Sequence, residues 1–352
     1  MSLATIPRES TELSLRSRVT VLGVALVAAN ALAWVWALAV LRDHPLLLGT
    51  ALLAWLLGLR HAIDPDHIAA IDNVTRKLLA QGQQPVSTGL WFALGHSSVV
   101  LAACMMIGLL ASGASGALAS FKPVGAVIGT LVSTLFLLVI GLLNLQIFLA
   151  VWRKAHDIRR GAAVSDEDFD TLASKQGLLA RLLRPLFALI SKPWHMYPLG
   201  LLFGLGFDTA TSIGLFSMAA VTASDGVSLW VVLVFPVLFT AGMALADAAD
   251  GAMMLGAYQW ARSNPMRKIY YNLSVTGLSV FIALAIGMVQ GLGILAERFQ
   301  FSGTFWTLLN ELREKFDVLG FVVVGIFALL WAGSAVYFRL TVTRGANVQA
   351  GE

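Results

Sequence analysis

Long apolar stretches, separated by short polar segments, dominate the chain. They lie at about 19–41, 45–70, 88–111, 124–152, 197–222, 228–257, 270–296 and 317–340. Because about 20 apolar residues in a helix cross the hydrocarbon core of a bilayer, each stretch predicts one membrane span. We therefore predict an all-α polytopic membrane protein, a bundle of eight transmembrane helices that forms one integral membrane domain over residues 1–352.

Composition supports this prediction. Hydrophobic residues make up 58% of the chain, the mean hydropathy is +0.79, and only 12% of the residues are charged, against about 25% in soluble domains. The single cysteine, Cys104, excludes an intramolecular disulfide and a Cys-x-x-Cys site. The apolar run at 19–41 is longer than the ~7–15 residues of a signal-peptide core, so we expect it to remain as the first membrane helix.

The distribution of basic residues predicts the orientation. With eight spans, eighteen of the 24 Lys and Arg residues lie on the side of the two termini, and short cytoplasmic loops collect positive charge. We therefore expect a protein of the cytoplasmic (inner) membrane with both termini in the cytoplasm. The longest polar segment, 153–196, is expected to be a cytoplasmic loop between spans four and five. The pI of about 9.4 then requires no nucleic-acid partner.

The second stretch ends in an unusual density of ionisable groups, GLRHAIDPDHIAAIDN at 58–73. On an ideal helix His61 and Asp66 would be about 140° apart, and His61 and His67 about 120° apart. Pro65 removes a hydrogen bond to the carbonyl of His61 and opens the helix at this turn. Such a broken second helix brings the three side chains round a common point, as in the ion sites of transporters. Imidazole and carboxylate without thiolate suit a divalent transition-metal ion such as Ni²⁺, Co²⁺, Zn²⁺ or Fe²⁺.

Further polar groups within apolar stretches extend this candidate site, because ionisable groups at membrane depth are costly and are therefore functional candidates. We expect Asp64 and His96 as additional ligands or outer partners, and we expect Asp208, Asp247 and Asp250 to line the path or balance charge. Simpler interpretations exist. The cluster at 58–73 could cap a helix end, His96 could form a hydrogen bond between helices, and Asp208 could pair with Arg60.

The segment RHAIDPDHIAAIDN resembles the signature of the nickel/cobalt transporter family of permeases, which is His, four residues, then Asp-His. The resemblance extends to LGHSSVV at 94–100, LGFDTATSI at 205–213 and GMALADAADGAMMLGAYQWA at 242–261. It implies eight transmembrane helices with cytoplasmic termini, and selective high-affinity uptake of Ni²⁺, Co²⁺ or both. It also implies that His61, Asp66 and His67 are central to metal recognition. Two positions depart from the family pattern, since Pro65 stands where Ala is common and Ser212 where many members have Glu.

We therefore expect a secondary permease that acts in the lipid bilayer, with the metal ion as its transported substrate and no cofactor or enzymatic activity. The chain has no GxxxxGK[ST] phosphate loop, so its energy has to come from a gradient or from a separate subunit. The alternative is an intramembrane zinc-dependent hydrolase. Such enzymes commonly carry His-Glu-x-x-His on a regular helix, and this chain lacks that motif.

Overall fold

A computed structural model describes residues 14–110, 115–160, 189–205, 228–262 and 265–315, with isolated positions between 318 and 333. Within these ranges the regular structure is helical. The α-helices are α1 (Leu15–Val40), α2 (Leu47–His61), α3 (Pro65–Ala80), α4 (Thr88–Leu110), α5 (Ser115–Arg159), α8 (Met196–Gly204), α10 (Leu229–Arg262), α11 (Pro265–Phe299) and α12 (Thr304–Glu314), and a short 3₁₀ helix, η1 (Pro193–His195), precedes α8. The predicted all-α class is confirmed for the described residues.

Among the described residues, five helical segments are long and apolar enough to cross a membrane, and they correspond to the predicted spans one, three, four, six and seven. They are Leu15–Val40, Thr88–Met106, Thr130–Arg153, Leu229–Tyr258 and Thr276–Phe299. A sixth is reached if α2 and α3, which are bent by 51° at a short break, count as one span. The fifth predicted span, 197–222, is described only as far as residue 205, and the eighth, 317–340, lies mostly outside the described residues.

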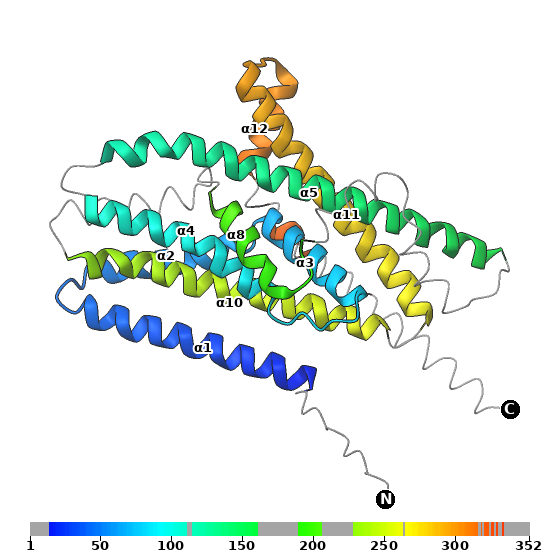
Figure 1. Cartoon of the computed structure of the whole chain (residues 1–352), viewed down its shortest axis with the longest axis horizontal. Coiled ribbons are helices and arrows are strands. Elements are labelled where there is room, and N and C mark those ends of the chain that lie inside the picture. The colour runs from blue at the N-terminus through cyan, green and yellow to red at the C-terminus, as the bar shows by residue number, and fades with distance from the viewer. Residues whose placement is uncertain are drawn as a thin grey trace, which may run out of the picture.

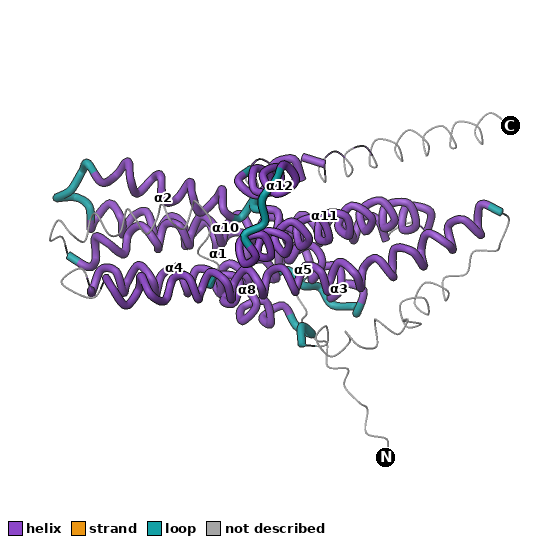
Figure 2. Tube along the Cα trace, turned by 90° about the horizontal axis from the view of Figure 1, so that it is seen from above, coloured by secondary structure: helices purple, strands orange, loops and turns teal. Residues whose placement is uncertain are grey.

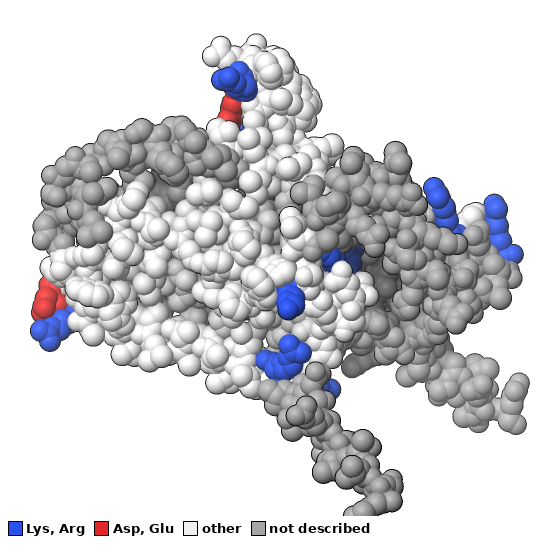
Figure 3. Space-filling model, in the orientation of Figure 1, with Lys and Arg blue, Asp and Glu red and all other residues white. Residues whose placement is uncertain are grey.

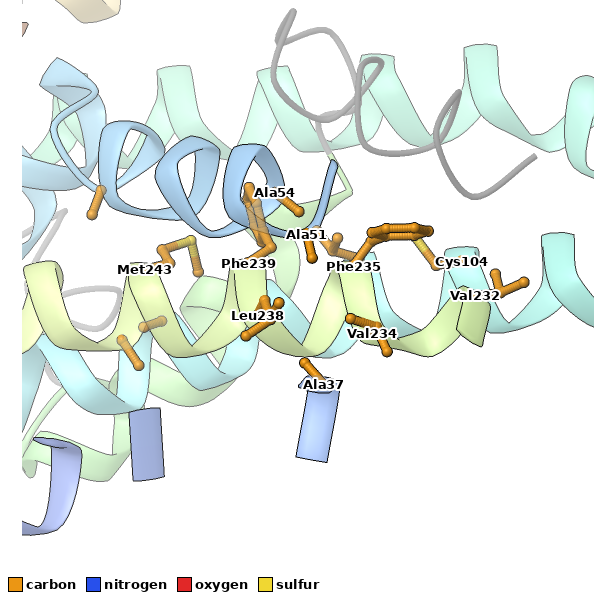
Figure 4. Packing of buried hydrophobic residues seen from close by; sticks show 14 of the residues in the cluster. Ala37, Ala51, Ala54, Cys104, Val232, Val234, Phe235, Leu238, Phe239 and Met243 are labelled. Carbon is orange, nitrogen blue, oxygen red and sulfur yellow. The ribbon is translucent and has the colours of Figure 1, made fainter. Parts of the chain in front are cut away.

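Helix α10 lies at the centre of one half of the bundle, in contact with α1, α2 and α4. These four helices run side by side along the long axis of the molecule (Figures 1 and 2). Their contact is a layer of buried side chains in which Phe235 and Phe239 of α10 lie against Ala51 and Ala54 of α2, with Cys104 of α4 beside them (Figure 4). Lipid tails are as apolar as the helix surfaces, so the hydrophobic effect does not drive helices together in a membrane. Close packing of side chains such as these holds them together instead.

Glycines allow the backbones of α2 and α10 to touch. A Cβ atom at Gly58 would collide with the backbone carbonyl of Phe239, and one at Gly242 would come within 2.6 Å of the carbonyl oxygen of Trp55. Close approach at small residues is a common feature of membrane helix pairs. As a result, the end of α2 that carries His61 is held directly against α10.

Helix α3 packs against α4, α5, α10 and α11. Most of its side chains are therefore buried, polar ones included, such as Asp72, Asn73 and Thr75, each with no exposed surface. The outer surface of the bundle is different, since most of the described surface in the view of Figure 3 carries no charge. Many large hydrophobic side chains are exposed among the described residues, while α3 keeps its polar groups inside, as expected for a chain whose solvent is lipid.

Candidate metal centre

The break between α2 and α3 positions the first two histidines. Helix α2 ends at His61, whose carbonyl accepts the backbone N–H of Asp64 at 3.0 Å in a tight turn. Asp64 is extended (φ −61°, ψ 138°), and Pro65 begins α3. Proline is favoured at this position because the first N–H groups of a helix have no intrahelical acceptor. The chain therefore changes direction between His61 and His67, and both side chains face the same interior.

Three buried histidines from α2, α3 and α4 meet at this break. His61, His67 and His96 each expose 4% or less of their surface, and their ring centroids lie 4.7 to 4.9 Å apart. The Nε2 atoms of His61 and His96 are 3.0 Å apart. One nitrogen from each ring can be chosen so that all three lie within 4.8 Å of one another.

These separations match a single ion. With metal–nitrogen bonds of about 2.1 Å, as for Zn²⁺, two ligands at a right angle are about 3.0 Å apart and two opposite ligands are about 4.2 Å apart. The 3.0 Å between His61 and His96 fits adjacent ligands. A small contraction of the wider 4.8 Å limit places all three nitrogens on one divalent transition metal, for which imidazole is a suitable ligand.

Carboxylates stand behind two of the three rings. His67 Nδ1 lies 3.3 Å from Oδ2 and 3.4 Å from Oδ1 of Asp247 on α10, and His61 Nδ1 lies 2.8 Å from Oδ2 of Asp64. A neutral His67 that donates its Nδ1–H to Asp247 presents an unprotonated Nε2 to the ion, whereas His61 Nδ1 lies close to Asp64 without the geometry of a hydrogen bond. This carboxylate–histidine–metal arrangement orients the ring and raises its basicity.

Aromatic rings form part of the wall around the histidines. The ring of Phe92 stands perpendicular to that of His67 with centroids 4.8 Å apart, and Phe239 lies 5.7 Å from His61. Both phenylalanines are fully buried. An apolar wall lowers the local dielectric constant, so an ion that enters has to exchange its water for protein ligands.

The backbone of α10 is held at Asp247 by α4. A Cβ atom at Gly89 of α4 would collide with the carbonyl of Asp247, so only glycine permits this approach. The short distance between the helices brings Asp247 within reach of His67 and places His96, two turns further along α4, beside both rings.

The remaining predicted site residues lie in several places. The Asp66 carboxylate accepts the backbone N–H of His67 at 3.0 Å and does not belong to the three-ring group. Asp250, on the same face of α10 as Asp247, has both carboxylate oxygens buried, and no described residue forms a hydrogen bond with them. Arg60 lies 3.9 Å from Asp64. Asp208, together with its suggested pairing to Arg60, lies outside the described residues.

Comparison with known proteins connects this geometry to a family. The family model described as high-affinity nickel-transport protein, NicO, matches residues 47–337. The chain belongs to the NicO family. This confirms the resemblance inferred from the four motifs, and it places the protein among metal-ion permeases and not among enzymes. The hydrolase alternative is therefore wrong.

Relatives of this NicO protein are similar over most of their length. It is 51% identical over 335 residues to the high-affinity nickel transport protein of Cupriavidus necator, a match that covers 95% of each chain. It is 42% identical over 295 residues to the high-affinity nickel-transport protein NixA of Helicobacter pylori, covering 82% of this chain and 88% of the relative. It is 36% identical over 297 residues to the cobalt transport protein NhlF of Rhodococcus rhodochrous, covering 84% of each chain. No solved structure matches the chain.

Sequence reasoning about this NicO protein missed the wall of the site. Phe92 and Phe239 lie in apolar runs and carry no local signal that separates them from ordinary core residues. Tyr258, which donates a hydrogen bond to Asp72 at 2.9 Å, could have been found. It lies eleven residues after Asp247, about 20° away around a helix with 100° per residue.

Proposed function

We propose that this protein takes up Ni²⁺, Co²⁺ or both across the cytoplasmic membrane, and that the ion binds to His61, His67 and His96. The observation that carries the proposal is the 3.0 Å separation of the Nε2 atoms of His61 and His96, with His67 in ring contact with both. The names of the relatives, which specify nickel or cobalt transport, support the choice of ion.

The proposed ligands, His61, His67 and His96, differ from those expected from the signature segment, His61, Asp66 and His67, because His96 takes the place of Asp66. Imidazole nitrogens supply the first contacts, and Asp64 and Asp247 orient two of the rings from behind. Asp66 supports the first turn of α3 through its bond to the His67 N–H. Nitrogen ligands favour Ni²⁺ and Co²⁺ over Mg²⁺ and Ca²⁺, which take oxygen, so this set selects a trace metal in the presence of abundant hard cations.

We further propose the full topology of eight membrane spans with both termini in the cytoplasm. Helices α2 and α3 would form the broken second span, and the 153–196 segment would be a cytoplasmic loop. The support is the distribution of Lys and Arg along the chain, together with the 51° bend at 62–64. Irregular backbone at membrane depth is tolerated where it is buried in protein or lines a cavity. In this turn Ala62 and Asp64 are buried, and Gly320 lies directly against the carbonyl of Ile63.

A membrane potential is sufficient to drive uptake in this scheme. An inside-negative potential contributes about 2.3 kcal/mol per charge per 100 mV, or about 4.6 kcal/mol for a dication. Carboxylates close to the histidines offset part of the cost of placing that dication in a medium of low dielectric constant. The ion therefore needs no nucleotide-driven step on this chain.

Uptake of ⁶³Ni and ⁵⁷Co at submicromolar metal with excess Mg²⁺ tests the proposal. We expect His61→Ala and His96→Ala to abolish accumulation of whichever ion the wild type transports. The matched control is His44→Ala, because His44 is an exposed histidine in the turn between α1 and α2 and should have no role. Membrane content is measured for each variant by immunoblot.

Wild-type accumulation in His96→Ala would contradict the three-histidine site. Equal loss in His44→Ala would show that the loss in the other variants reports general damage and not the removal of a ligand. If the wild type accumulated neither ion, the transported substrate would have to be another divalent metal.

A further inference from the structure

A second buried polar cluster lies further along α3 and α10 than the three histidines. Its centre is Asp72, which has no exposed surface. Asp72 accepts hydrogen bonds from Tyr258 of α10 at 2.9 Å and from Ser279 of α11 at 2.5 Å. Arg76, one turn later on α3, lies 3.8 Å from the same carboxylate. Three helices thus contribute to one polar region inside the bundle.

Asp250 is the unusual member of this region. Both of its carboxylate oxygens are buried, and neither has a hydrogen-bond partner among the residues that the structure describes. Burial is the largest penalty on its charge, Asp72 and Asp247 add repulsion, and His67 adds a weaker attraction. No Lys or Arg in the described part of the chain forms an ion pair with it. An isolated carboxylate in such surroundings is costly, and two like charges nearby add to the cost.

The position of Asp250 suggests what offsets that cost. It lies three residues after Asp247, on the same face of α10 and about 4.5 Å further along the axis. Asp72 follows His67 by five residues, which is about 7.5 Å along α3. The pairs His67–Asp247 and Asp72–Tyr258 show that both helices advance in the same direction. The oxygen cluster therefore comes after the nitrogen cluster on the way to the ends of α3 and α10.

We propose that Asp250 and Asp72 form a second, all-oxygen cation station, which receives the metal ion after it leaves the three histidines. This inference rests on the proposed uptake function. Carboxylate oxygen holds a late first-row metal less tightly than imidazole does. A pathway also needs sites weak enough, and numerous enough, for the ion to leave. The step from nitrogen to oxygen ligands thus provides an exit from a site that binds the ion selectively.

The first test separates binding from transport. Asp250→Asn keeps the shape of the side chain and removes its charge, and Ni²⁺ affinity is measured by calorimetry on purified protein beside ⁶³Ni uptake in cells. We expect the Kd for Ni²⁺ at the histidines to rise no more than about tenfold, because Asp250 lies about 4.5 Å further along α10 than Asp247, while the uptake rate at saturating Ni²⁺ falls at least tenfold. His96→Ala should lose both binding and uptake. Asp43→Asn, at an exposed carboxylate paired with Arg42, is the control and should change neither.

The second test detects the station directly with Mn²⁺, an ion that carboxylate oxygen suits. In a variant with His61, His67 and His96 all changed to Ala, Mn²⁺ binding is followed by electron paramagnetic resonance. We expect saturable Mn²⁺ binding in this variant, weakened at least tenfold when Asp250→Asn is added. Because both proteins lack the histidines, the comparison stands whether or not those residues bind Ni²⁺.

Three outcomes would overturn the inference. Wild-type uptake in Asp250→Asn would show that the ion does not need the station. Loss of Ni²⁺ affinity equal to that of His96→Ala would place Asp250 in the first site. Lost uptake combined with unchanged Mn²⁺ binding would assign Asp250 to another task, such as proton movement. If His96→Ala instead kept its Ni²⁺ binding and uptake, the proposed function would fail, and the Mn²⁺ comparison would still decide whether Asp250 binds a cation.

Discussion

Replacement of Asp247 by Asn tests whether a carboxylate behind the histidines controls metal affinity. Asp247 is fully buried, and its two oxygens lie 3.3 and 3.4 Å from Nδ1 of His67. Asn has nearly the same shape and can still accept the Nδ1–H through its carbonyl oxygen. The substitution therefore removes the negative charge with little change in packing.

The expected magnitude follows from the geometry. An ion on Nε2 of His67 would be about 7 Å from the Asp247 carboxylate, taking a metal–nitrogen bond of about 2.1 Å. At an effective dielectric constant of about 20, the attraction between a dication and one negative charge at that distance is about 5 kcal/mol. The cost of burying the carboxylate in the ion-free protein offsets part of this. Changes in such outer partners typically cost 10–100-fold in metal affinity, and we expect Asp247→Asn to be near 100-fold, about 2.8 kcal/mol.

Asp64→Asn provides the comparison, because the Asp64 carboxylate lies 2.8 Å from Nδ1 of His61 but without the hydrogen-bond geometry that joins His67 to Asp247. Its carboxylate is less buried and lies 3.9 Å from Arg60, so part of its charge is already balanced in the ion-free protein. We expect a smaller loss, about tenfold. Calorimetric titration of purified protein with Ni²⁺ at neutral pH gives both values, with size-exclusion chromatography as the check on folding.

The relative loss of Ni²⁺ affinity in Asp247→Asn and Asp64→Asn tests the reasoning. An unchanged Kd in Asp247→Asn would refute the outer-partner role of this carboxylate. A larger loss in Asp64→Asn than in Asp247→Asn would refute the argument from burial and charge, even if both variants bound metal less tightly.

The remaining predictions concern pH, stability and topology. Metal uptake should fall as the external pH is lowered from about 7 to 5, because a histidine has to be neutral to bind a metal and protons compete for the same nitrogen; uptake that stays constant over this range would contradict histidine ligation. Asn30→Ala should lower the thermal stability without changing the Kd for Ni²⁺. Asn30 donates to the carbonyl of Ala241 at 3.1 Å and accepts from Trp55 at 2.9 Å, and two such bonds between membrane helices contribute about 1 kcal/mol together; a changed Kd with an unchanged melting temperature would reverse this assignment. Cys104 is the only cysteine, so Cys104→Ser gives a cysteine-free background for labelling intact cells with an impermeant thiol reagent. In this background Asp43→Cys should react, because its turn is predicted to lie outside, and a cysteine introduced near the C-terminus should not.

Much of the architecture could be predicted from hydropathy, and the reason is physical. In lipid every backbone polar group has to be satisfied within its own segment, so a long apolar stretch has few options besides a helix. The predicted stretches at 19–41, 88–111, 228–257 and 270–296 lie within or very close to α1, α4, α10 and α11. Helix lengths were harder to predict, since α5 continues to Arg159, beyond the apolar run that indicated it.

Several residues of the candidate site could also be predicted from the sequence, since a charged or imidazole side chain at membrane depth is rare and therefore indicates a functional site. His61 and His67 were recognised together with the break at Pro65, and the structure has α2 ending at His61 and α3 beginning at Pro65. His96 was expected only as an additional ligand or outer partner. The structure places its Nε2 at 3.0 Å from that of His61, so His96 is a full member of the three-ring group.

The roles within the site depended on tertiary structure. Local spacing relates residues within one helix, and it cannot say that Asp247 of α10 faces His67 of α3 across 180 positions of sequence. Nor can it say that Asp66, although it is part of the signature segment, accepts the backbone N–H of His67 and lies outside the three-ring group. Glycine contacts between helices decide these distances, because the absence of a side chain at Gly89 and Gly58 determines how closely α10 approaches its neighbours. The sequence by itself determined that this chain enters the membrane and carries metal-binding side chains there, and the packing of four helices decided which of those side chains meet.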